Sequence, residues 1–153
     1  MNHFDPAAVT KALKDEGLEI DADESKGIWM MSFEFNARKQ PAILSAPGGE
    51  SSISGHYFYA VSFISSERLK DSIDELSVDV LRKILKVQAE VLLAKFDYWT
   101  IEGKTRYVAM SPCSIVAFDG LKLRRRLESC AELASRIRAA LLDHDASTDD
   151  REQ

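Results

Sequence analysis

The sequence contains little cysteine and little histidine, and it has no long apolar run. Its 153 residues include 2 cysteines and 3 histidines, which are too few for a disulfide framework or a four-thiolate metal site. No run approaches the roughly 18 apolar residues that a membrane-spanning helix needs. The first residues, MNHFDP, are polar and acidic and lack the apolar core of a signal peptide. We therefore expect a cytoplasmic protein with no membrane partner.

An excess of positive charge is also absent. The chain has 20 Lys and Arg against 25 Asp and Glu, which gives a formal net charge of −5. Nucleic-acid-binding domains usually present a basic surface, so this balance argues against nucleic acid as a partner. The 45% hydrophobic and 29% charged content is typical of a globular protein, and 153 residues suit one domain with a substantial core.

No motif for catalysis or ligand binding is complete. The segment APGGESS has two adjacent glycines but lacks the Lys-Ser/Thr of a phosphate loop, and we interpret it as a loop between strands. DADESKG, from Asp21, begins like a calcium loop, yet Ser32 stands where the twelfth position requires Glu. Cys113 has no histidine nearby in the sequence. We therefore predict no catalytic residue, no cofactor and no metal. A small enzyme whose site is not visible in the sequence stays as an alternative.

Hydrophobic periodicity predicts a single α+β domain over residues 1–143, with the order α-β-β-β-α-β-β-α and an antiparallel sheet packed against helices. Asp5-Pro6 is typical of a helix start and Gly17 of a helix end. The segments IWMMSFEF, PAILSA and HYFYAVSFIS indicate three strands. The third is apolar on both faces, so we expect it in the centre of the sheet.

Two longer helices are predicted in the second half. The first has a broad apolar face between Ile73 and Leu92 that includes Leu85. The second runs from about Asp119 to Asp143 and needs a partner surface for a seam of apolar and small residues: Leu123, Leu127, Cys130, Ala134, Ile137 and Leu141. Residues 144–153 are charged and without large apolar side chains, so we predict a disordered acidic tail.

The segment KFDYWTIEGKTRYVAMS predicts a hairpin whose turn is Glu102-Gly103. Such a turn pairs Ile101 with Lys104, Trp99 with Arg106, Tyr98 with Tyr107, and Phe96 with Ala109. Strand alternation then places an uncharged set toward the interior: Phe96, Tyr98, Thr100, Thr105, Tyr107 and Ala109. The other face is mixed, and we expect Arg106 to stack on Trp99 there: Asp97, Trp99, Ile101, Lys104, Arg106, Val108 and Met110. This mixed face is either a sheet face that is half exposed or partly covered by a helix, or a partner or dimer surface.

A basic run on the last predicted helix supports a second alternative. Arg124-Arg125-Arg126 lies beside Lys122, and such a cluster can contact phosphate groups. In an acidic chain the same run is more often a solvated face paired with acids such as Glu128. A nucleic-acid-associated regulatory adaptor is therefore the alternative function.

The order of the predicted helices and strands resembles that of a known fold, and two segments of the sequence support the resemblance. VLRKILKVQAEVLLAKFDYWTIEGKTRYVAMSP is similar to the long helix and hairpin, and AFDGLKLRRRLESCAELASRIRAAL to the closing helix, of the fold shared by type III secretion chaperones and the YbjN family of bacterial sensory transduction regulators. The resemblance covers about residues 4–143. The basic run departs from it, because YbjN-like sequences often carry an acidic residue there.

The resemblance implies a non-enzymatic, cytoplasmic homodimer that binds a partner or client protein. Chaperones of this fold hold an extended client segment along apolar patches, and the segment gains main-chain hydrogen bonds and pockets for its side chains. Strand parity supplies the candidate contacts on this chain: Trp99, Ile101, Arg106, Val108 and Met110, with Ile28 and Met30 as a second patch.

Overall fold

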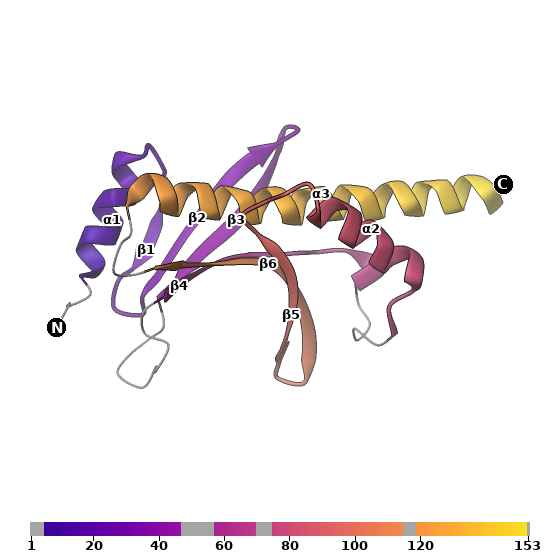
Figure 1. Cartoon of the computed structure of the whole chain (residues 1–153), viewed down its shortest axis with the longest axis horizontal. Coiled ribbons are helices and arrows are strands. Elements are labelled where there is room, and N and C mark those ends of the chain that lie inside the picture. The colour runs from indigo at the N-terminus through magenta and orange to yellow at the C-terminus, as the bar shows by residue number, and fades with distance from the viewer. Residues whose placement is uncertain (1–4, 47–56, 70–74, 115–118, 153) are drawn as a thin grey trace.

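The protein is a single antiparallel sheet with helices on one face (Figure 1). The computed structural model describes residues 5–46, 57–69, 75–114 and 119–152. In chain order these ranges form α1 (Pro6–Asp15), β1 (Asp21–Asp23), β2 (Ile28–Phe35), β3 (Arg38–Ser45), β4 (Tyr57–Phe63), the 3-10 turn η1 (Glu67–Leu69), α2 (Val78–Gln88), β5 (Lys95–Ile101), β6 (Lys104–Ser114) and α3 (Gly120–Glu152). The six strands lie in the order β1-β2-β3-β4-β6-β5, and every neighbouring pair is antiparallel. The α+β class and the central position of β4 are confirmed, whereas the chaperone-like fold stays a prediction.

Two boundaries differ from those predicted, and one short strand is added. β1 lies in the acidic connector GLEIDADESKG, which can hold a short extended segment, although its three exposed residues give no periodic signal. β3 begins at Arg38 rather than at Pro41, which is exposed and lies outside the β3–β4 pairing that starts at Ile43. α3 continues to Glu152, through the segment predicted to be a disordered tail. No glycine or proline follows Gly120 to end that helix.

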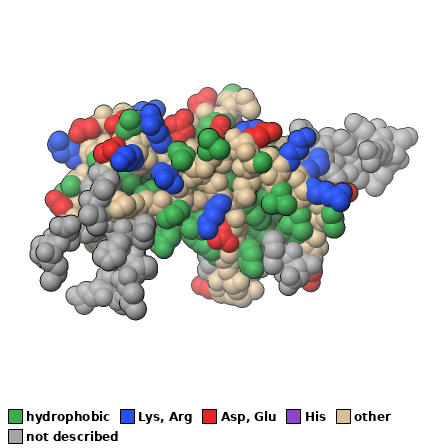
Figure 2. Space-filling view, viewed as in Figure 1, with side chains coloured by type: hydrophobic (Ala, Val, Ile, Leu, Met, Phe, Trp, Pro, Cys, Tyr) green, Lys and Arg blue, Asp and Glu red, His purple; other side chains and the backbone are tan. Residues whose placement is uncertain are grey.

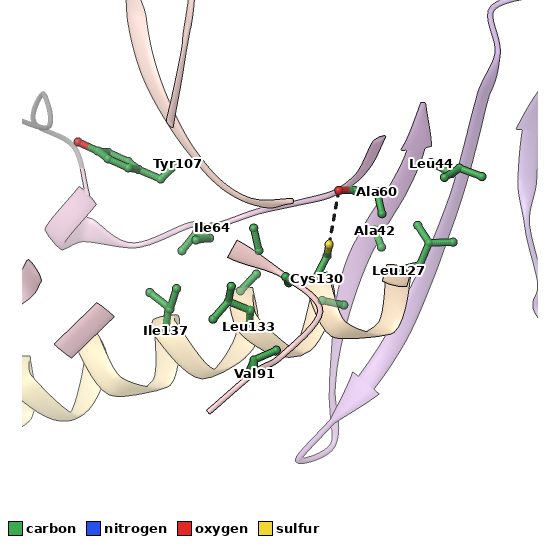
Figure 3. Close-up of a cluster of buried hydrophobic side chains, with 14 of the residues drawn as sticks. Ala42, Leu44, Ala60, Ile64, Val91, Tyr107, Leu127, Cys130, Leu133 and Ile137 are labelled. Atoms are coloured by element: carbon green, nitrogen blue, oxygen red, sulfur yellow. Dashed lines mark hydrogen bonds between the residues drawn. The ribbon is translucent and has the colours of Figure 1, made fainter. Parts of the chain in front are cut away.

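The core lies between α3 and the sheet. Every residue of the predicted seam on α3, from Leu123 to Leu141, is at most 1% exposed. The strands present small, fully buried side chains to it, among them Ala42 and Ala60, which allow the helix to approach closely. Figure 3 shows Leu127, Leu133 and Ile137 pointing from α3 toward these strands, and the Cys130 thiol donates to the Ala60 carbonyl oxygen at 3.4 Å. The seam prediction is confirmed, with the sheet as its partner surface.

α1 packs against both the sheet and α3. Its start is as predicted, because the Asp5 side chain accepts a hydrogen bond from the backbone N–H of Ala7 and Pro6 follows it. Trp29 of β2 donates its indole N–H to the Thr10 hydroxyl at 2.9 Å. A Cβ on Gly120 would lie 2.4 Å from the Ala12 carbonyl oxygen, so glycine is required where α3 begins against α1.

The second predicted helix is shorter and less buried than its pattern indicates. α2 ends at Gln88, and Ile73 lies outside the described residues. Leu85 is 61% exposed and Leu92 is 92% exposed, so the expectation that both belong to the core face is wrong. The buried side of α2 carries Val80 and Ile84, and Leu85 lies outside it; Leu92 follows the end of the helix. Figure 2 shows hydrophobic side chains gathered in the lower middle of this view of the molecule.

The turn between β2 and β3 contains a strained alanine. Asn36 and Ala37 have φ of 52° and 62°, the left-handed conformation that a two-residue hairpin turn requires. An L-residue in this region costs roughly 1 kcal/mol, and glycine adopts it freely. Ala37→Gly is therefore expected to raise the free energy of unfolding by about 0.5–1 kcal/mol, as measured by urea denaturation. Ala22→Gly, in an extended strand, is the control and should destabilise; a loss of stability in both variants would contradict the assignment of the turn.

Candidate functional site

The β5–β6 hairpin has the predicted register. Trp99 lies opposite Arg106 and Phe96 opposite Ala109, and the turn residues Glu102 and Gly103 both have positive φ, 51° and 77°. On the helix side, Phe96 stacks on Tyr107 with ring centroids 5.6 Å apart. Tyr107 and Ala109 are buried as predicted, whereas Phe96 and Thr105 are half-buried and Thr100, near the hairpin tip, is exposed.

Tyr98 departs from the predicted interior face. Its side chain is 45% exposed, although parity places it beside Phe96 and Tyr107. β5 is an edge strand, and the tip of the hairpin points away from α3 in Figure 1, so α3 does not cover this position. Parity alone therefore assigns the face of a side chain but not its burial.

The face of the sheet opposite α3 is continuous across the strands, and we call it the open face. Met30 of β2 lies opposite Ile43, Ile43 opposite Val61, and Val61 opposite Met110, so one row of apolar side chains crosses four strands. Among the described residues, the buried cluster on this face consists of strand residues and includes none from a helix: Val61, Val108 and Met110, with Tyr59, Phe63 and Trp99 packed against them. The open face thus has its own small apolar cluster.

A groove of about 400 Å³ is hollowed into the open face. Its walls come from four strands: Ile43 and Ser45 of β3; Tyr59, Val61 and Phe63 of β4; Asp97 and Trp99 of β5; and Met110 of β6. Trp99 meets Phe63 edge to face, with ring centroids 6.1 Å apart. A volume of several hundred Å³ with mainly apolar walls is typical of a binding site.

The predicted contacts on the hairpin have different positions relative to this groove. Trp99 is half-buried and Met110 is 8% exposed, and both line it. Val108 is fully buried and does not line the groove, so it has no surface to present to a partner. Arg106 is exposed, but its guanidinium lies over Phe63, 5.6 Å from the ring centroid, rather than on Trp99 as predicted. The side chain of Ile101 lies outside the described part of the chain.

The second predicted patch shares the open face but lies outside the groove. Ile28 is half-buried and Met30 is 44% exposed. Both belong to β2, and neither lines the groove. Ile43, Tyr59 and Phe63 were not predicted to belong to a site, because the sequence does not show that β4 lies between β3 and β6 in the sheet.

Side chains block the edge strand β5. The backbone N–H of Phe96 donates to Gln88 Oε1 at 2.6 Å, and that of Tyr98 donates to Asp97 Oδ1 at 2.8 Å. The opposite edge, β1, has three residues, two of them exposed aspartates. Short, charged or capped edges disfavour the addition of a further strand. An extended partner is therefore better accommodated across the open face than along an edge.

Two arginines of the basic run have structural partners. Arg124 donates to the Glu16 carbonyl oxygen at 2.8 Å and pairs with Glu128 at 3.8 Å, the acid predicted to face the run. Arg126 donates to the Ser111 hydroxyl at 3.0 Å. These contacts hold α3 to the end of α1 and to β6. Arg125 is exposed. Binding of nucleic acid by the run stays the alternative prediction.

Both cysteines are buried thiols. Cys130 belongs to the core, as predicted, and burial raises its pKa to about 12. Burial likewise raises the pKa of Cys113 to about 11, despite the nearby Arg126. A thiol needs its thiolate form to act as a nucleophile, so neither is activated near neutral pH.

These pKa values predict how the thiols react. Both cysteines should resist a disulfide reagent at pH 8 in the folded protein and react fully in urea. Unfolding returns each pKa to its ordinary value of 9.0, so thiol burial contributes stability that is complete below pH 9 and is lost as the pH rises through 11 to 12. Rapid reaction of either thiol in the native protein would contradict this assignment.

Comparison with known proteins does not assign the chain to a family. No family model matches it, and no curated protein matches it. Within the described ranges, no helix is both long and apolar enough to cross a membrane. The same residues contain no group of three or more His, Cys, Asp and Glu side chains placed to hold a metal ion.

Proposed function

We propose that the protein is a non-enzymatic binding module that holds a segment of a partner or client protein in the groove of the open face. The observation that carries this proposal is the groove itself, with aromatic and aliphatic walls on a sheet face whose described apolar cluster includes no helix residue. A contiguous apolar surface that lines a groove is typical of an interaction site. A cytoplasmic role of the YbjN or secretion-chaperone type is part of the proposal and rests on the resemblance in element order.

A displayed library of random twelve-residue peptides tests the proposal. We expect the wild-type protein to enrich peptides that bind in the micromolar range, because an apolar groove gives a side chain a place to be buried. Trp99→Ala should weaken their binding at least tenfold, as measured by calorimetry. Ile43→Lys, which places a charge in the opposite wall, should have the same effect and does not depend on how well the Trp99 variant folds.

Tyr98→Ala is the matched control. Tyr98 is an exposed aromatic residue on the same strand, but it lies on the other face of the sheet. Its loss should leave peptide affinity within about twofold. Peptides that bind Trp99→Ala and Ile43→Lys as well as they bind the wild type would exclude the groove as the binding site.

The proposal also includes a homodimer, formed through a surface separate from the groove. Val78 and Leu85 lie seven residues apart on one side of α2, each 61% exposed, and Leu92 follows the helix almost fully exposed. Light scattering should give twice the 17.1 kDa chain mass, and Leu85→Glu should reduce it to a monomer. A monomer at high protein concentration would contradict this part of the proposal alone.

A further inference from the structure

We propose that the groove is selective for a cationic side chain, an arginine or lysine, carried by an extended partner segment with apolar neighbours. This inference rests on the proposed function and specifies its ligand. It is drawn from three features of the described residues: the position of Asp97, the three aromatic rings that line the same groove, and a cation that already lies on one of these rings.

Asp97 supplies the negative charge. Of the eight described residues that line the groove, it alone is charged. It is half-buried, its Oδ1 accepts the Tyr98 backbone N–H at 2.8 Å, and none of the ion pairs among the described residues involves it. A carboxylate on a mainly apolar wall attracts a cation more strongly than one in open solvent, because the surroundings screen it less.

Aromatic rings supply the rest of the site. Tyr59, Phe63 and Trp99 line the same groove as Asp97. The face of an aromatic ring attracts an ammonium or guanidinium group, and a carboxylate in the same groove adds charge complementarity. The aliphatic stem of arginine or lysine meanwhile packs on apolar walls such as Ile43 and Met110.

One of these rings, Phe63, already lies against a cation. Arg106 reaches across the open face and places its guanidinium 5.6 Å from the centre of the Phe63 ring. It does so without forming an ion pair with Asp97. The acidic chain, at −5, adds a general attraction for a basic segment. Charge and ring geometry therefore favour a basic occupant over an acidic one.

Three synthetic peptides test this selectivity. Each alternates valine and serine, and the central residue is arginine, norleucine or glutamate. Binding is followed by tryptophan fluorescence, because Trp99 lines the groove whereas Trp29 is fully buried. The arginine peptide should bind at least tenfold more tightly than the norleucine peptide, and the advantage should shrink between 50 mM and 500 mM salt.

Asp97→Asn should remove most of the preference for arginine and leave the affinity for norleucine unchanged. Asparagine retains an oxygen that can accept the Tyr98 N–H, so the strand is preserved. Glu102→Gln, which removes an exposed acid from the hairpin turn, is the matched control and should keep the full preference.

The outcomes separate this inference from the proposed function. Equal binding of arginine and norleucine peptides, both weakened by Trp99→Ala, would overturn the cation selectivity and leave the binding module intact. Tighter binding of the glutamate peptide would also overturn it. A dimer that is lost in Trp99→Ala, with no peptide bound by the wild type, would show that a second copy occupies the groove and would overturn both proposals.

Discussion

Replacing Val108 by aspartate is expected to unfold the protein or bring it close to unfolding. Val108 is fully buried between β4 and β5, where Val61, Phe63 and Trp99 enclose it. An unpaired carboxylate at such a position costs about 3–5 kcal/mol. A domain of this size has only about 5–15 kcal/mol of stability in total. Urea denaturation followed by circular dichroism should show a large fall in the midpoint.

Val108→Ala is the matched control for this experiment. It removes two methyl groups without adding charge and is expected to cost about 2 kcal/mol, so the difference between the variants isolates the charge. A Val108→Asp protein as stable as the wild type would show that water reaches this position. The buried cluster of the open face would then not exist as described.

Trp29→Ala is expected to have an effect of similar size by a different route. Trp29 is fully buried, contacts Phe58 edge to face at 6.3 Å and donates to Thr10 of α1. Truncating a buried tryptophan leaves a cavity and typically costs about 3–5 kcal/mol. Because the indole connects α1 to the sheet, hydrogen exchange should also become faster at Val9 and Leu13, the buried residues of that helix.

Thr10→Val separates the contribution of hydrogen bonding at Thr10 from the contribution of indole packing to the free energy of unfolding. It removes the hydroxyl that accepts the indole N–H and donates to Glu24 Oε1 at 2.7 Å but keeps the volume, so we expect a loss of about 1–2 kcal/mol. If Trp29→Ala cost no more than Thr10→Val, the indole would contribute a hydrogen bond and little packing. Trp29 would then not be part of the packed core.

The sequence predicts much of the fold because its local patterns agree with one another. The Glu102-Gly103 turn and the alternation on either side fix the hairpin register, and the structure has the predicted pairs. The apolar seam of α3 is equally clear, since residues that share one side of a helix must share one environment. The acidic connector can hold a short extended segment, but its bounds are not predictable because the three exposed residues of β1, Asp-Ala-Asp, carry no apolar signal.

The groove could be predicted only in part. Parity identified Trp99 and Met110, but the walls from β3 and β4 depend on which strands neighbour β6, and that is a long-range property. Parity also cannot separate Val108, which its neighbours bury completely, from the half-exposed Trp99 on the same face. Burial on an open sheet face is decided by the side chains of adjacent strands, and a single sequence does not place them.

The same limit explains the position of Arg106. Direct pairing places it opposite Trp99, yet its guanidinium lies over Phe63, on β4. A long side chain reaches diagonal neighbours in a sheet as well as the direct partner. The choice between the two rings depends on the relative position of three strands.

Acrylamide quenching of tryptophan emission, with and without a saturating library-derived peptide, decides whether the partner segment occupies the groove of the open face. Trp29 is fully buried, so quenching of the free protein should come mainly from Trp99. The binding account predicts that the peptide shifts the emission to shorter wavelength and protects it from quenching, and that Trp99→Phe abolishes both effects. A bound peptide that leaves the emission and its quenching unchanged would contradict the account, because the peptide would then lie outside the open-face groove.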